Sequence, residues 1–195
     1  MNRSILPLLI LALMAIAFRL VGAFFPTDFP NFQPLPALLL CSIVFLKGPA
    51  RWLLPLGIWI LTDPFVSLLQ GYPVVGPHHL SLALGLGAVV ALAMLARRSS
   101  RSALPMLLTT AAGAVAFFFL TNLVSFLMDP IYPKSWAGFM QAQWTGPAGA
   151  LLPTWVFLRN LLAANLLFTG LFLLGNRIPS HREAPATAAG DKRTA

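Results

Sequence analysis

Seven polar or charged residues within or beside long apolar stretches are the side chains of this chain best suited to bind a ligand. They are Arg19, Asn31, Asp63, Asn122, Asp129, Arg159 and Asn160. A charged side chain within a membrane span is energetically expensive, so such residues usually face a protein interior or a water-filled cavity and mark a ligand path. The arginines suit an anionic group, and Asp63 and the asparagines suit polar groups. The pattern predicts a polar substrate-binding pocket.

Catalytic and metal chemistry is not expected. His78 and His79 are adjacent, and consecutive residues on a regular backbone point in different directions, which makes them poor partners for one metal ion. Cys41 is the single cysteine, so it cannot form a disulfide within the chain or a multi-thiolate metal site. The sequence has no Ser and His arrangement, His-Glu-x-x-His pattern or phosphate loop. We therefore expect neither an enzyme nor a cofactor.

Composition indicates the class of protein that positions these residues. Of 195 residues, 58% are hydrophobic and 9% are charged, and the mean hydropathy is +0.81, which is typical of an integral membrane protein. A helix needs roughly 20 residues to cross the hydrocarbon core. About six or seven spans are therefore the most that this chain could hold, with no room for a second folded domain.

Six apolar runs predict an all-α transmembrane bundle. They cover about residues 4–25, 31–46, 52–69, 80–96, 104–128 and 154–174. We expect one domain over residues 1–176 and a disordered tail over residues 177–195. The first run could be a signal peptide cleaved near Ala15-Ile16-Ala17, but the apolar stretch resumes after Arg19, which favours a retained span.

Two connections are unusual. The run at 31–46 is short for a span and follows three prolines, so it either begins near Asn31 or is bent and partly re-entrant. The long connection over residues 130–153 contains Trp136 and Trp144, which suit a segment at the membrane interface or a lid over the pocket.

The distribution of basic residues predicts the orientation. Ten Lys and Arg residues fall at the amino end, in two connections and in the tail, whereas the opposite connections contain only Lys134. The positive-inside rule therefore places both termini in the cytoplasm. Six of the candidate residues, all except Asn31, would then lie in the outer half of the membrane. Two alternatives stay open: basic side chains could snorkel at interfacial ends, or Arg19 or Arg159 could pair with Asp63 or Asp129 only to hold the bundle together.

Short strings in a fixed order carry a resemblance to a known family. They are Asn31-Phe32-x-Pro34, Thr62-Asp63, Leu120-Thr121-Asn122, Tyr132-Pro133-Lys134, Arg159-Asn160 and Asn165-Leu166-Leu167-Phe168-Thr169. Over about residues 5–175 the chain resembles a family of small, uncharacterised bacterial membrane proteins with about six spans. The resemblance implies a multi-pass protein of the bacterial inner membrane.

That family in turn resembles the substrate-binding (S) subunits of energy-coupling factor transporters in its architecture. By this resemblance, the protein would bind a small polar or anionic solute, such as a vitamin, in an outward-facing pocket. Its partners would be the lipid bilayer, the solute, a transmembrane coupling subunit and cytoplasmic ATPases, with no nucleic acid. The alternative is a structural or assembly membrane protein whose buried polar residues only hold the bundle together.

Overall fold

The structure, a computed structural model, describes residues 4–76, 78–99 and 102–177. These residues form helices and connections without a strand, so the prediction of an all-α chain is confirmed. The helices are α1 (Ile5–Phe24), α2 (Leu35–Phe45), α3 (Ala50–Leu69), α4 (His78–Ser99), α5 (Ala103–Met128), α6 (Trp136–Trp144) and α7 (Trp155–Arg177). The predicted tail over residues 177–195 lies, from residue 178 on, outside the described residues.

Five helices, α1, α3, α4, α5 and α7, are long and apolar enough to cross a membrane. They correspond to five of the six predicted runs, with ends that differ from the predicted ones by a few residues. The remaining predicted run, 31–46, contains α2, which has 11 residues and is therefore only about 16 Å long. That is about half the thickness of the hydrocarbon core. The number of spans and the cytoplasmic location of the termini stay predictions.

Helix α2 lies at the centre of the bundle. It contacts α1, α3, α4, α5 and α7, and residues 35–44 of this helix are all buried. Its composition explains the position, because a helix that is apolar on every side has no face to expose to water and is buried among other elements. A short central helix leaves the rest of the membrane depth to the irregular chain that precedes it.

That irregular chain, the 25–34 segment, connects α1 to α2. Pro26, Pro30 and Pro34 prevent a continuous helix here, and Asn31 adopts a left-handed conformation with φ 56°, which asparagine tolerates better than most residues. The helix thus begins at Leu35 and not near Asn31. A start near Asn31 is therefore wrong, and a bent, partly re-entrant path stays a prediction.

Two asparagines of α7 hold the 25–34 segment in place. Asn160 donates from Nδ2 to the Pro30 carbonyl at 3.0 Å. Asn165 donates to the Gln33 carbonyl at 3.3 Å and accepts from the Ala37 amide at 2.7 Å. Irregular backbone at membrane depth needs such partners, because no water is present there to satisfy its polar groups.

Helix α6 was not predicted as a helix. Its N-cap Ser135 accepts a hydrogen bond from the Gly138 amide at 3.2 Å, and a Cβ on Gly138 would lie 1.9 Å from the Pro133 carbonyl oxygen, so only glycine fits there. Gln143 is fully buried and donates to the Phe119 carbonyl at 3.4 Å. These contacts pack α6 against α5.

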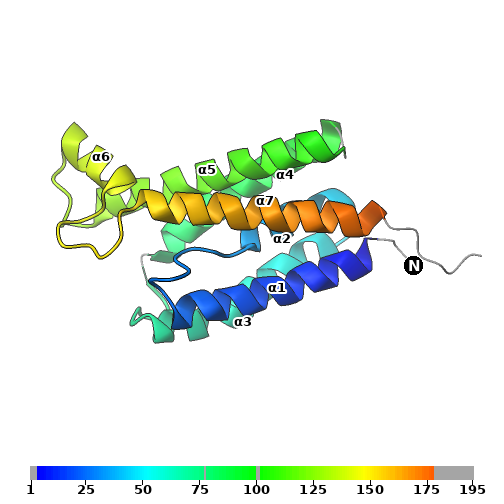
Figure 1. The fold of residues 1–195 in the computed structure, drawn as a ribbon, viewed down its shortest axis with the longest axis horizontal. Coiled ribbons are helices and arrows are strands. Elements are labelled where there is room, and N and C mark those ends of the chain that lie inside the picture. The colour runs from blue at the N-terminus through cyan, green and yellow to red at the C-terminus, as the bar shows by residue number, and fades with distance from the viewer. Residues whose placement is uncertain (1–3, 77, 100–101, 178–195) are drawn as a thin grey trace, which may run out of the picture.

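The ends of the helices fall into two groups (Figure 1). The start of α1 and the end of α7 lie at one end of the bundle, which we call the terminal end. The opposite end, called the α6 end, holds α6, the 25–34 segment and the end of α3 together with the start of α4.

Candidate functional site

A cavity of about 330 Å³, partly open to the surface, lies in the half of the bundle near the α6 end. Its walls are the second halves of α1, α3 and α5, the first turns of α4 and α7, and the 25–34 segment. Aromatic rings form much of the apolar wall: Phe18, Phe29, Phe32, Phe117, Phe118 and Phe157. The polar wall includes Arg19, Asn31, Gln33, Asp63, His78 and Asn122.

A buried ion pair forms the centre of the polar wall. Arg19 Nη2 lies 3.0 Å from Asp63 Oδ1, and the two side chains are 4% and 9% exposed. The pair joins α1 to α3 at the same depth in the bundle. Trp59, one turn before Asp63, donates from Nε1 to the same carboxylate oxygen at 3.1 Å. Arg19 from α1 and Trp59 from α3 itself thereby fix the orientation of the Asp63 carboxylate.

The ion pair extends into the 25–34 segment through amide side chains. Arg19 Nη1 donates to Gln33 Oε1 at 2.9 Å, and Gln33 Nε2 donates to Asn31 Oδ1 at 2.9 Å. The left-handed backbone at Asn31 turns this amide toward Gln33 within the same loop. The segment is therefore part of the polar wall and not only a connection.

The third nitrogen of Arg19 has no such partner. Arg19 is 6% exposed, and its Nε makes no hydrogen bond to any described residue. An unpaired buried donor costs about 1–3 kcal/mol. A donor of this kind in a side chain that lines a cavity is well suited to an acceptor supplied by a ligand or a water molecule.

His79 completes the surroundings of Asp63. Its Nε2 lies 3.0 Å from Asp63 Oδ2, while its Nδ1 lies close to the backbone of Gly76. The sequence alone does not connect His79 with Asp63, because 16 residues and a turn separate them and no helical periodicity relates them. Among the described residues, one group of side chains could hold a metal ion, namely Asp63, His78 and His79.

Four of the seven predicted binding residues line the cavity: Arg19, Asn31, Asp63 and Asn122. They come from α1, the 25–34 segment, α3 and α5, and the fold brings them to one cavity. Asn122 also donates to the Phe118 carbonyl of its own helix at 3.0 Å. The role of these residues in binding a solute stays a prediction.

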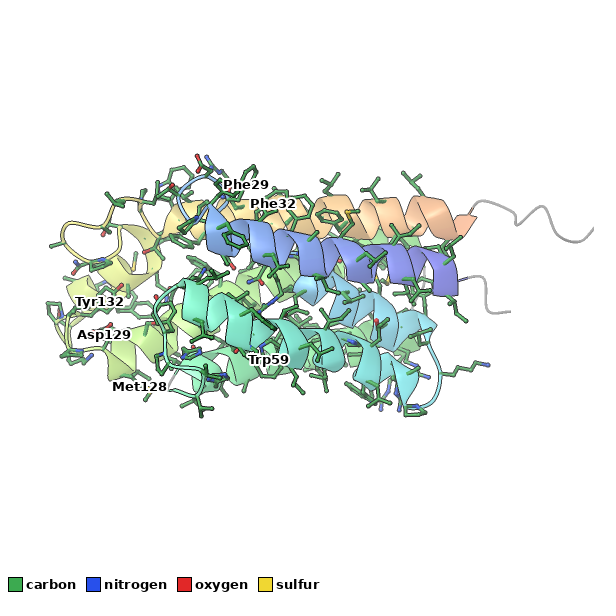
Figure 2. All side chains as sticks on the ribbon, turned by 90° about the horizontal axis from the view of Figure 1, so that it is seen from below. Phe29, Phe32, Trp59, Met128, Asp129 and Tyr132 are labelled. Carbon is green, nitrogen blue, oxygen red and sulfur yellow. The ribbon has the colours of Figure 1, made fainter. Side chains whose placement is uncertain are left out.

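The other three predicted residues lie elsewhere. Asp129 caps the end of α5 and accepts from the Ile131 amide at 3.0 Å. Figure 2 shows it at the α6 end of the bundle, apart from Phe29 and Phe32. Arg159 is exposed, stacks over Trp155 at 5.5 Å and donates to Asn160 at 3.1 Å. Asn160 itself binds the 25–34 segment.

Trp136 and Trp144, which were predicted to form a lid over the pocket, also lie elsewhere. Trp136 stacks on Phe139, Trp144 meets the edge of Phe119, and neither tryptophan lines the cavity. Close to this region, burial raises the pKa of Tyr132, and the Asp129 carboxylate raises it further. The tyrosine hydroxyl is therefore neutral at physiological pH.

The comparisons with known proteins identify a family but no activity. A family model described as a family of unknown function, DUF6580, matches residues 1–186. No curated protein and no solved structure matches the chain. The resemblance to S subunits of energy-coupling factor transporters thus stays a prediction. Because the family model covers nearly the whole sequence, the chain belongs to the DUF6580 family.

Proposed function

We propose that this protein binds a small polar or anionic solute in the cavity lined by Arg19 and Asp63, and that it serves as the substrate-specificity subunit of a nutrient transporter. The observation that carries the proposal is the position of the ion pair. A pair that only fastened two helices would be enclosed by packed side chains, whereas this one borders a cavity of about 330 Å³.

The chemistry of the cavity walls narrows the range of solutes that would fit. Ligand pockets have volumes of about 300–1,000 Å³, and this cavity is at the small end of that range. Arg19 is the one lysine or arginine among the described residues of the wall, and Asp63 pairs with it. The unpaired Nε of Arg19 and the amides of Gln33 and Asn122 favour a solute with a hydrogen-bond acceptor at one end, and the phenylalanine rings favour a flat or apolar remainder.

The proposed direction of capture follows from charge. Lys47, Arg51, Arg97 and Arg98 lie at the terminal end of the bundle, opposite the cavity. The positive-inside rule assigns that end to the cytoplasm, so the cavity would open toward the outer side. The chain carries no phosphate-binding motif, and energy for transport would come from a transmembrane coupling subunit and cytoplasmic ATPases, as the architectural resemblance implies.

Two pairs of variants test the proposal. Arg19→Gln and Asp63→Asn alter the cavity, while Arg159→Gln and Asp129→Asn make the same chemical changes outside it. Native mass spectrometry of gently extracted protein would show a small molecule retained by the wild type and by the two outside variants, and lost from the two cavity variants. Equal retention in all four variants, or no retained molecule in the wild type, would contradict the proposal.

The second candidate function is a structural or assembly role. It is favoured by one observation, which is that Arg19 and Asp63 satisfy each other and join α1 to α3. Under this alternative, the cavity variants lower stability and no solute is ever found. Asn122→Ala separates the two functions, because Asn122 lines the cavity and its hydrogen bond, among the described residues, stays within its own helix. It should weaken solute retention while lowering the free energy of unfolding by under about 1 kcal/mol.

A further inference from the structure

Asp63, His78 and His79 form a compact cluster beside the cavity. Each offers one ligand atom, and these atoms all lie within 4.8 Å of one another. The two imidazole rings have centroids 4.1 Å apart, although adjacent residues on a regular backbone diverge. His78 and His79 are the first two residues of α4, so both rings lie at the end of this helix that meets Asp63.

The hydrogen bonds of the cluster leave the right atoms for a metal ion. Asp63 Oδ1 is occupied by Arg19 and Trp59, whereas Oδ2 contacts only His79 among the described residues. His78 Nε2 is buried and has no hydrogen-bond partner in the described part of the chain. An unpaired imidazole nitrogen beside a carboxylate oxygen is an incomplete polar site, which a cation would complete.

The second nitrogen of His79 is placed as in metal-binding histidines. A metal-ligating histidine usually donates its other N–H to a backbone carbonyl or a carboxylate, which fixes the ring and its tautomer. In one tautomer His79 Nδ1 accepts a hydrogen bond from the Gly76 amide at 3.2 Å, and it also lies 3.1 Å from the Gly76 carbonyl oxygen. With the proton on Nδ1, this contact becomes that hydrogen bond, and Nε2 presents its lone pair toward Asp63 Oδ2, 3.0 Å away.

We infer that Asp63, His78 and His79 bind one divalent first-row metal ion of the class that prefers imidazole, such as Zn²⁺. Zinc takes nitrogen and carboxylate ligands at about 2.0–2.2 Å in a tetrahedron, so its ligand atoms are about 3.4 Å apart. The His79–Asp63 distance is already close to this value. His78 lies at the start of a helix, after a turn, where a small rotation can bring its ring closer.

The site would leave a fourth position for a solute. Three protein ligands with one open position are typical of zinc sites that bind a further molecule, and both Asp63 and His78 line the cavity. Bound beside Arg19, the ion makes this wall net positive. This narrows the proposed solute to one with an anionic, metal-coordinating group such as a carboxylate. Only this last step rests on the proposed function, since metal binding itself needs no solute.

The test uses Zn²⁺ alone as the probe. The full-length protein, purified in detergent with a tag that lacks histidine and treated with a chelator, is titrated with Zn²⁺ against a chromophoric chelator. We expect one Zn²⁺ per chain and an affinity at least tenfold lower in His78→Ala. His181→Ala, which removes the third histidine of the sequence, is the matched control and should bind like the wild type.

The results separate the metal site from the solute site. Absence of stoichiometric Zn²⁺ binding to the wild type overturns the inference, as does an unchanged affinity in His78→Ala. His79→Ala provides a second variant, and an increase in unfolding temperature on adding Zn²⁺, seen in the wild type and absent from both variants, supports it. Solute retention is read separately by native mass spectrometry, so either proposal can fail while the other holds.

Discussion

The Arg19–Asp63 pair allows a quantitative test of how the polar wall is built. The two side chains are 4% and 9% exposed. Removing one partner of a buried pair leaves an uncompensated charge and costs roughly 3–5 kcal/mol. We therefore expect Asp63→Leu and Arg19→Met each to lower the free energy of unfolding by an amount in that range.

The double variant should be much less destabilised than the two single variants together. Replacing both partners of a buried pair by apolar residues of similar size is often neutral or stabilising. Here Trp59, His79 and Gln33 would each lose a hydrogen bond worth about 0.5–1.5 kcal/mol, part of which water in the cavity can replace. With single losses of about 3–5 kcal/mol each, we expect a net loss of about 2 kcal/mol in the double variant and hence a coupling energy of at least about 4 kcal/mol, which is above the usual range for residues in contact.

The free energies of unfolding can be measured by denaturant titration in mixed micelles, followed by tryptophan fluorescence. The control is Asp129→Leu with Arg159→Met, which carries the same two changes outside the cavity and should be additive. A coupling below about 0.5 kcal/mol between Arg19 and Asp63 would refute the buried pair. A stable double variant that still retains solute would contradict a role of the pair in binding.

Three further predictions concern the support of the site and its orientation. Asn165→Ala should destabilise the protein by about 2–4 kcal/mol, because it leaves a buried backbone amide unpaired, whereas Asn122→Ala should cost under about 1 kcal/mol; equal losses in the same titration would contradict the role of Asn165. Gly138→Ala should increase proteolysis around α6, because a Cβ does not fit against the preceding turn; an unchanged cleavage pattern would be evidence against this packing. In intact cells, a membrane-impermeant thiol reagent should label Gln70→Cys but not Lys47→Cys, and the reverse result would place the cavity on the cytoplasmic side.

The long helices were predictable because hydrophobic length is a property of a sequence segment alone. The position of a residue along its apolar run was predictable for the same reason. It correctly indicated that Arg19 and Asp63 lie in the same half of the bundle. The direction in which a side chain points around its helix axis could not be predicted in this way. Asp129 and Arg159 have the same depth signal, but the first caps a helix end and the second lies on an exposed face.

Contacts that depend on the conformation of a loop could not be predicted from the sequence either. His79 reaches Asp63 only because the turn before α4 directs it there, and Gln33 reaches Arg19 only because of the backbone at Asn31. Helix α6 was missed because its nine residues are flanked by prolines and glycines that outweigh a short helical signal. One signal was available and unused, since Trp59 and Asp63 are four residues apart on the same helix face.

The 25–34 segment forms part of the cavity wall, and hydrogen bonds from α7 hold its backbone in place. Its backbone is tied to α7 by the amides of Asn160 and Asn165, and neither asparagine lines the cavity. A displacement of α7 along its axis would pull on these ties and move Asn31 and Gln33 relative to Arg19. The shape of the cavity thus depends on the position of a helix that contributes only Phe157 to its lining.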